Sequence, residues 1–259
     1  MWVEHSTLKK STKILAPFGL VALLVALWWM AVTSSRSLIF PAPGQVVLGI
    51  VELMQQGLLL KHVSASLFRV ALGYLLAAAC AIPLGVFIGW CSGAYAAFNP
   101  LIQLLRPISP IAWIPLAILW FGVGDSSPIF LIFLSSFFPT VVQTAAGVHT
   151  IERQYIRAAQ NFGAADLKLF RLVILPAALP QIITGMRIGL GVAWLVVVAA
   201  EMIAINSGLG YLIIDSRNAG NRYDLVLAGM VIIGVIGLLL DSCMQRLQRL
   251  RMVQWCYGR

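Results

Sequence analysis

The sequence predicts an all-α fold, a bundle of membrane-spanning helices, from its composition and from the spacing of its apolar segments. Of its 259 residues, 60% are hydrophobic and only 10% are charged, and the mean hydropathy is +0.92. A helix needs about 20 apolar residues to cross a bilayer. Six segments approach or reach this length: residues 14–33, 65–90, 102–121, 129–148, 182–205 and 225–240. We therefore expect a polytopic bundle of about six transmembrane helices.

The first and last of these segments are the least regular in length and flanks. Segment 14–33 follows a cluster of lysines, as the apolar part of a signal peptide does. It is about 20 residues long, however, and no small-residue cleavage pattern closes it, so we expect an uncleaved span. Segment 225–240 is short, and we expect it to stand nearly upright or to extend into its flanks.

The segment at 102–121 is interrupted by Pro107, Pro110 and Pro115. Each proline frees a backbone carbonyl, which in a membrane a neighbouring helix or a watery cavity must satisfy. Broken helices near the midplane therefore indicate a translocation path. We take Pro110, Trp113 and Pro115 as candidate residues of such a path.

The net charge of +9 is explained by topology rather than by a nucleic-acid partner. With six spans and the amino terminus inside, eleven Lys and Arg residues fall on the cytoplasmic side and four on the other, which is the positive-inside bias. The eleven are Lys9, Lys10, Lys13, Arg153, Arg157, Lys168, Arg171, Arg246, Arg249, Arg251 and Arg259, and the four are Arg36, Lys61, Arg217 and Arg222. We expect a multi-pass membrane protein with both termini in the cytoplasm.

An amphipathic segment, residues 41–57, follows the first span on the outer side. Its apolar residues recur at helical spacing: Val47, Ile50, Val51 and Met54. We expect a short helix on the outer face, either a connector packed on the bundle or a docking element for a binding protein. The chain then divides into an N-terminal span with this outer segment (1–63), a core of spans (64–243) and a basic cytoplasmic tail (244–259).

The longest polar interruption, residues 149–171, predicts a short amphipathic helix at the cytoplasmic membrane surface. Its apolar face has helical spacing: Ile151, Tyr155, Ala159 and Phe162. Another face is polar: Arg153, Arg157 and Gln160. Gly163 ends this helix and Asp166 begins a second, while Pro176 limits how the second helix joins the next span. Such a helix is suited to docking on a partner in the water.

The same loop carries a family resemblance. Its motif residues are Ala158, Ala159, Gly163, Leu175 and Pro176. Their spacing resembles the EAA loop of permease subunits of bacterial ABC importers, although Arg157 stands where that family usually carries Glu. Residues 66–74, 106–140 and 199–213 look similar to the nitrate-, sulfonate- and taurine-type permeases, and the resemblance covers residues 64–241.

The resemblance implies a type I ABC importer permease fold and a subunit that forms the translocation pathway for a small anion, such as an aliphatic sulfonate, taurine or nitrate. It also implies a second permease copy, two cytoplasmic ATP-binding cassette subunits and an extracytoplasmic substrate-binding protein. ATP and Mg would be bound by the ATPase, and no cofactor by this chain. The residues implied to couple to the ATPase are Tyr155, Arg157, Ala158, Ala159, Phe162, Gly163, Leu175 and Pro176.

Two alternatives belong to other classes. A stand-alone secondary transporter or channel often has inverted repeats and more helices, and neither is visible in the sequence. A membrane enzyme would need a catalytic motif, but the chain has no H-E-x-x-H, no G-x-S-x-G and no phosphate-binding G-x-x-x-x-G-K-[ST]. We assign no catalytic or metal-binding residue. The four cysteines form no C-x-x-C pair, and we expect free thiols.

Charged residues in or near the spans are costly in lipid and are candidate functional residues. Arg69, near the outer end of its span, is a candidate pathway cation that would concentrate an anion at the outer mouth. Glu201 either pairs with an arginine to hold helices in register or lines an outer gate. Arg106, Arg187 and Asp241 are expected near the cytoplasmic ends, where snorkelling or pairing satisfies them.

Small residues indicate where helices pack closely. Gly85 with Gly89, and Gly185 with Gly189, have the small-x-x-x-small spacing of membrane helix contacts. We expect these glycines to pack helices together, within one bundle or between two copies, rather than to contact substrate. His62 and His149 are expected in interfacial loops at the ends of spans.

The charge asymmetry predicts which positions face the cytoplasm. In a cysteine-free background, a Gln160→Cys variant should react with a membrane-impermeant thiol reagent only from the cytoplasmic side, and an Asn218→Cys variant only from the outer side. Reaction at position 160 from outside intact cells would reverse the topology.

Overall fold

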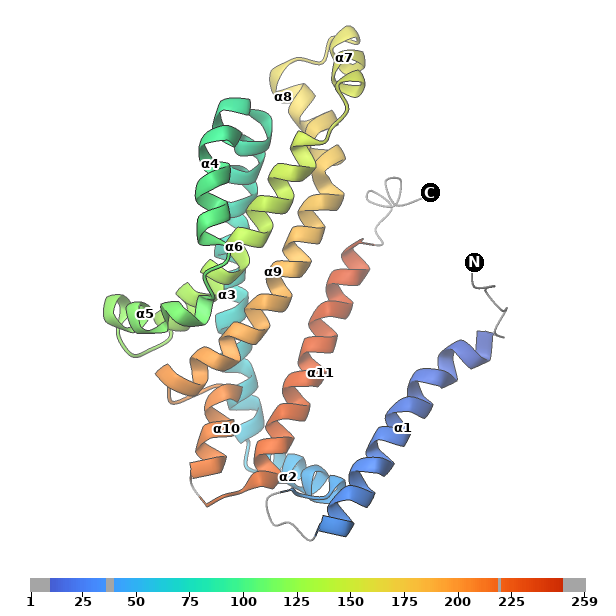
Figure 1. Cartoon of the computed structure of the whole chain (residues 1–259), viewed down its shortest axis with the longest axis vertical. Coiled ribbons are helices and arrows are strands. Elements are labelled where there is room, and N and C mark those ends of the chain that lie inside the picture. The colour runs from blue at the N-terminus through green and yellow to red at the C-terminus, as the bar shows by residue number, and fades with distance from the viewer. Residues whose placement is uncertain (1–9, 36–39, 219, 249–259) are drawn as a thin grey trace.

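Figure 1 shows the computed structural model of the chain, in which residues 10–35, 40–218 and 220–248 are described. These residues form helices and no strand, which confirms the all-α prediction. In chain order they are α1 (Lys10–Ser35), α2 (Pro43–Gln55), α3 (Leu58–Trp90), α4 (Ser92–Leu105), the 3-10 helix η1 (Pro110–Trp113), α5 (Ile114–Phe121), α6 (Ser126–His149), α7 (Arg153–Asn161), α8 (Asp166–Leu169), the π-helical η2 (Phe170–Ile174), α9 (Leu175–Ala204), α10 (Leu209–Asn218) and α11 (Tyr223–Gln248). Of the residues used above, Lys9, Arg36, Arg249, Arg251, Cys256 and Arg259 lie outside the described ranges.

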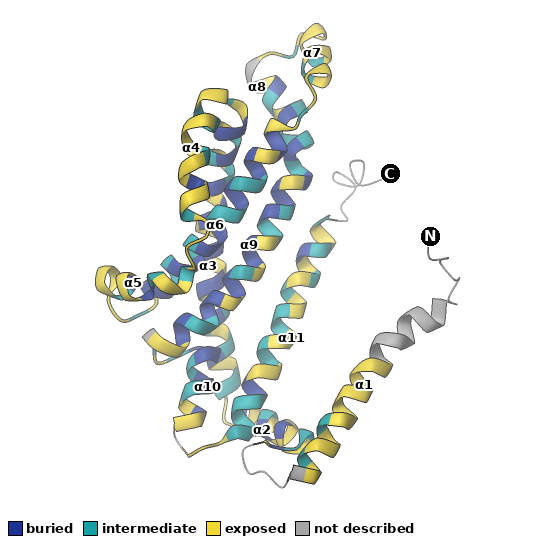
Figure 2. Cartoon of the chain, viewed as in Figure 1, coloured by how far each residue is buried: buried dark blue, intermediate teal, exposed yellow. Residues whose placement is uncertain are grey.

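Helix α6 forms the centre of the bundle, because α3 and α9 both pack along it. Helices α7 and α8 lie at one end of the bundle, and α2 and α10 lie at the other (Figure 1). Burial is concentrated on α3, α6 and α9, whereas α1 and much of α11 are exposed in the isolated chain (Figure 2). Apolar exposed surface of this kind is what a helix presents to lipid.

Four helices are long and apolar enough to cross a membrane: α3, α6, α11 and the continuous helix Leu167–Ile203 that contains α9. A fifth span exists if α4 and the helices that follow it, a bent pair, count as one. Helix α1 has 26 residues, but its described apolar part is the shorter Gly19–Ser34, so a sixth span remains a prediction. Helix α11 also has 26 residues, which means that the short segment 225–240 does extend into its flanks.

The segment at 102–121 is broken near its prolines, as expected, but its helix begins earlier than predicted. Helix α4 begins ten residues earlier, at Ser92, and the chain then turns by 83° between Ser92–Leu105 and Pro110–Phe121. Pro107 lies in the break, and Pro110 and Pro115 each occupy the first turn of a helix, where a missing N–H removes no intrahelical hydrogen bond. These two prolines therefore start helices and do not kink one.

The amphipathic segment at residues 41–57 forms α2, as predicted, and its buried residues are other ones than the four of the predicted apolar face. The buried residues of α2 are Val46, Gly49 and Leu53, whereas Val47, Val51 and Met54 are exposed. Gly49 allows the close approach, since a Cβ there would lie 3.1 Å from the Leu225 side chain in α11. The remaining apolar face of α2 is left for the membrane or a partner.

The four glycines singled out above all lie where α3 or α9 crosses α6. A Cβ on Gly85 would lie 2.6 Å from Cβ of Thr144, and one on Gly89 would lie 2.5 Å from the carbonyl oxygen of Ala145. In α9, a Cβ on Gly185 would meet Gln143 at 2.7 Å, and one on Gly189 would meet the Ser136 carbonyl oxygen at 3.1 Å. Within the single chain, these positions have no room for a side chain.

We expect Gly89→Ala to lower the free energy of unfolding by about 1–3 kcal/mol, because the added methyl group must push α3 away from the α6 backbone. The matched control is Gly191→Ala, in the interior of α9, where a Cβ meets nothing within 4 Å and alanine favours the helix by about 0.5–1 kcal/mol. Thermal unfolding of the purified protein in detergent measures both. Equal stability of the two variants would contradict this packing.

Candidate functional site

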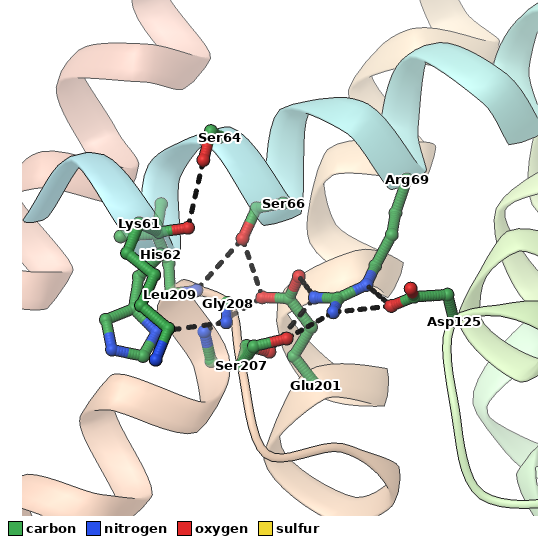
Figure 3. Close-up of polar contacts among 11 residues, drawn as sticks. Lys61, His62, Ser64, Ser66, Arg69, Asp125, Glu201, Ser207, Gly208 and Leu209 are labelled. Atoms are coloured by element: carbon green, nitrogen blue, oxygen red, sulfur yellow. Dashed lines mark hydrogen bonds and ion pairs between the residues drawn. The ribbon is translucent and has the colours of Figure 1, made fainter. Parts of the chain in front are cut away.

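A buried polar network lies near the end of the bundle that holds α2 and α10, and Arg69 of α3 is at its centre (Figure 3). The side chain of Arg69 is only 2% exposed, and the Glu201 side chain in α9 is fully buried. Nη1 of Arg69 lies 2.7 Å from Oε1 of Glu201, and Nη2 lies 2.7 Å from Oδ1 of Asp125, at the start of α6. The guanidinium also donates hydrogen bonds to the carbonyl and hydroxyl oxygens of Ser207, at 3.0 and 2.5 Å.

The same network supplies partners for the first backbone N–H groups around the start of α10. The N–H of Gly208 donates to Nδ1 of His62 at 3.1 Å. The N–H of Leu209 donates to the Ser66 hydroxyl at 2.9 Å, and that hydroxyl donates to Oε2 of Glu201 at 2.8 Å. The N–H of Gly210 donates to the same carboxylate oxygen at 3.0 Å. Helix starts leave backbone donors without intrahelical acceptors, and here side chains of two other helices accept them.

Two glycines make this arrangement possible. Gly208 has a φ of +107°, and a Cβ there would occupy the position of the Glu201 carboxylate. A Cβ on Gly210 would collide with the backbone carbonyl of Val198 in α9. The turn between α9 and α10 can therefore close over Glu201 only with glycine at both positions.

The geometry answers the question that the sequence left open for Glu201: it pairs with an arginine. Arg69 is enclosed by two carboxylates and by Ser207, so its charge is neutralised within the protein and does not face a mouth. His62, expected in a loop, is instead buried in α3. Asp125 and Ser207 were not predicted as site residues. Gly208 and Gly210 are typical of a tight turn and could have pointed to the segment that holds Ser207.

At the opposite end, α7 forms the predicted surface helix and Gly163 ends it. Gly163 has a φ of +80°. Its N–H donates to the Gln160 carbonyl at 2.9 Å, and the N–H of Ala164 donates to the Ala159 carbonyl at 3.0 Å. This pair of bonds is the Schellman motif, in which a residue with positive φ, usually glycine, closes the helix.

The face that α7 turns to its own chain differs from the prediction. Ile156 and Ala159 are half-buried and pack with Phe170 and its neighbours. Tyr155 is 58% exposed and Phe162 is 93% exposed, and Ala158 is exposed between them. Ala159 therefore faces its own chain in part. The exposed apolar residues, Tyr155 and Ala158 of α7 with Phe162 directly after it, are called the outward surface of α7 below.

The remaining coupling-loop residues lead into α9. Arg157 is exposed. Leu175 and Pro176 are half-buried in the first turn of α9, and Pro176 does not interrupt the helix, because η2 runs directly into α9. The result is one continuous helix, Leu167–Ile203, of 37 residues. It joins the α7 loop to the polar network, since Glu201 lies near its far end.

The candidate pathway residues lie on the segment between α4 and α6. Pro110 lines a cavity formed with α6 and α9. Trp113 is half-buried and packs against a cluster that contains Ile114, Ala117 and Leu131, while Pro115 is exposed. The structure brings none of these three residues into contact with the polar network around Arg69.

A second ion pair holds α9 to α11 nearer the α7 end. Nε of Arg187 lies 2.7 Å from Oδ1 of Asp241, and Nη2 donates to Oδ2 at 3.0 Å, so the contact is bidentate. The two residues are therefore paired, as expected, and their place near the cytoplasmic ends of the spans stays a prediction. His149 ends α6 and stacks on Tyr95 at a centroid distance of 4.8 Å.

Among the described residues, Cys80, Cys91 and Cys243 are free thiols. In the same part of the chain, no group of three or more His, Cys, Asp or Glu side chains is arranged to hold a metal ion.

The chain belongs to the family of binding-protein-dependent transport system inner membrane components, which matches residues 81–252. It is 38% identical over 254 residues to the taurine transport system permease protein TauC of Escherichia coli, covering 95% of this chain and 91% of that protein. It is 36% identical to the putative aliphatic sulfonates transport permease protein SsuC of Bacillus subtilis, covering 91% and 86%. It is 33% identical to the nitrate import permease protein NrtB of a Synechocystis strain, covering 93% and 90%.

Solved structures show the same fold at low sequence identity. A chain of the inward-facing methionine ABC transporter MetNI aligns with a TM-score of 0.65 at 18% identity, covering 74% of this chain and 95% of that chain. A chain of the bacterial alginate ABC transporter, solved with its alginate-bound periplasmic protein, aligns with a TM-score of 0.64 at 16% identity, covering 96% and 99%. The fold is therefore that of ABC importer permeases.

The network around Arg69 predicts a graded loss of stability. Arg69→Gln and Glu201→Gln should each cost about 3–5 kcal/mol, because each leaves a buried charge without its partner. Asp125→Asn is the matched control: its side chain is 58% exposed, and we expect a loss of at most about 1 kcal/mol.

Thermal unfolding of the purified protein, read together with its yield in the membrane, measures the three variants. A steering role for Arg69 predicts a different result, namely normal stability of Arg69→Gln with only anion uptake reduced.

Proposed function

We propose that this chain is the membrane-spanning subunit of an ABC importer for a small sulfonate or nitrate anion. Two copies would form the pathway, two cytoplasmic ATP-binding cassette subunits would drive it, and an extracytoplasmic binding protein would deliver the anion. Both termini would lie in the cytoplasm. ATP and Mg would be bound by the ATPase subunits, consistent with the absence of a phosphate-binding loop from the sequence.

The observation that carries this proposal is the outward surface of α7. Tyr155, Ala158 and Phe162 stand at i, i+3 and i+7 of a short helix, so they share one face. Two aromatic side chains on that face are exposed at an end of the molecule, outside the helices that would cross the membrane. Aromatic side chains left exposed together are typical of a protein–protein contact, and the small Ala158 between them permits close approach.

The continuous helix Leu167–Ile203 supplies a way to transmit motion from that contact. Its 37 residues span about 55 Å at 1.5 Å per residue. One end adjoins the α7 loop, and the other end holds Glu201 in the network around Arg69. Closure of the ATPase dimer on ATP would move α7, and the helix would carry that movement toward the outer end. The equilibrium between the inward-open and outward-open states would then shift. The size of that shift is set by the difference in contact energy between the two states.

The anionic substrate class is supported by the relatives, which include permeases named for taurine, aliphatic sulfonates and nitrate. These anions share a compact negatively charged group with several oxygen acceptors. A stand-alone transporter or channel would leave the exposed aromatic face of α7 without a role. In an importer, this face would be the contact with the ATPase subunit.

The test is uptake by the complete complex, with its ATPase and binding protein, in proteoliposomes. We expect ATP-dependent accumulation of taurine, an alkanesulfonate or nitrate. Phe162→Asp should reduce that uptake at least tenfold while the protein still inserts and folds, because Phe162 is 93% exposed and contributes little to the bundle.

Arg153→Gln is the matched control, since Arg153 is exposed on another face of the same helix and its loss should leave uptake close to wild type. Full uptake by Phe162→Asp would refute the docking surface. Failure of the wild-type complex to accumulate any of these anions would refute the substrate class.

A further inference from the structure

Between α4, α6 and α9 lies a cavity of about 250 Å³ that the polar network around Arg69 does not touch. The break that follows α4 contributes Arg106, Ile108 and Pro110 to its lining. Helices α6 and α9 contribute the rest, including Gln143 and Ile188. At about 30 Å³ for each molecule in the liquid, its volume is that of roughly eight waters. This space suits a small hydrated ion or a small organic anion.

Arg106 is exposed in the single chain, and it stands level with the middle of the bundle and not at the cytoplasmic end expected from the sequence. Helix α4 starts at Ser92, at the end of the bundle nearer α7, and has 14 residues before Arg106. At 1.5 Å per residue those residues span about 21 Å, against a hydrocarbon core about 30 Å thick. Figure 1 shows α4 ending beside the middle part of the bundle. A cation at such a depth is expensive in lipid and marks a functional position.

No carboxylate neutralises Arg106 within the described part of the chain. The ion pairs found there involve Arg69, Arg187 and Arg222, and none of the residues lining the cavity is acidic. The other polar side chains at the cavity are Ser135, whose hydroxyl donates to the Ile132 carbonyl at 2.8 Å, and Gln143, whose amide has N–H groups to donate. The cavity lining therefore carries one positive charge, and the Gln143 amide can supply further hydrogen-bond donors.

We propose that Arg106 forms an oxyanion-binding site within the translocation pathway, with Gln143 as a second hydrogen-bond donor. This inference rests on the proposed function. A guanidinium can donate two parallel hydrogen bonds to a sulfonate or a nitrate, and positive side chains line anion pores for this reason. The apolar remainder of the lining, such as Ile188, keeps the number of contacts small, so the anion can leave again.

The first experiment measures the electrostatic potential in the cavity without relying on transport. Ile188→Cys, in a background whose four native cysteines are serines, places a thiol on the cavity wall at a position that is 44% exposed. The assembled complex is treated with two methanethiosulfonate reagents, one carrying a sulfonate and the other a quaternary ammonium. The ratio of their reaction rates reports the sign and strength of the local charge.

We expect the anionic reagent to be favoured, and Arg106→Gln to lower the rate ratio at least fivefold. Taurine or nitrate at millimolar concentration should slow modification when Arg106 is present and not in Arg106→Gln. Arg217→Gln is the matched control: it removes one exposed cation from α10 and should leave the ratio unchanged. A ratio that Arg106→Gln does not alter overturns the proposal.

The second experiment separates this inference from the proposed function. In proteoliposomes, Arg106→Gln should reduce anion uptake at least tenfold, and Arg106→Lys, which keeps the charge but not the two-pronged geometry, should retain more. If the wild-type complex accumulates the anion and Arg106→Gln does so equally well, the oxyanion-binding site is refuted while the importer function stands. If the wild-type complex accumulates none of the anions tested, the importer function itself is refuted.

Discussion

The ion pair between Arg69 and Glu201 is the contact on which the half of the molecule with α2 and α10 depends. It joins α3 to α9 where lipid could not solvate either charge, so each buried side chain depends on the other for a partner. Because the same carboxylate accepts the Ser66 hydroxyl and the Gly210 N–H, the pair also fixes how α10 starts. Asp125 and Ser207 complete the shell around the guanidinium, so the start of α6 and the α9–α10 turn are held by the same side chain.

The two ends of the long helix that contains α9 have opposite physical characters. At the end that holds Glu201, charges and hydrogen bonds hold four segments in one arrangement, and glycine is required at Gly208 and Gly210 for the turn to close. At the end near α7, the contacts are apolar and partial, and none of the α7 residues is buried. One helix thus joins a tightly held end at Glu201 to a weakly held end at α7. This arrangement suits a movement of α7 relative to a fixed network around Arg69.

Hydropathy was sufficient to predict the class of fold and the position of most spans, because the bilayer requires long apolar helices. It could not predict which apolar face packs inward. In α2, Val47 and Met54 face outward while Gly49 is buried, since close approach to α11 needs a small residue and the surroundings accept apolar ones. The depth of Arg106 was missed because Asn99 and Pro100 interrupt the apolar run, yet both lie inside α4. Partners such as Asp125, 56 residues from Arg69, leave no local pattern in a single sequence.

The π-helical turn Phe170–Ile174 affects the direction in which α7 faces relative to α9. A π-helix bonds each N–H to the carbonyl five residues back, so it accommodates one residue more than an α-helix along a similar length. Each residue of an α-helix advances the azimuth by about 100°, from its 3.6 residues per turn. An extra residue inserted into regular α-helix would therefore rotate everything before it, including the outward surface of α7, by about that angle relative to α9. Because the π-helical turn takes up its extra residue within itself, the protein carries that residue while the aromatic face of α7 keeps its direction relative to α9.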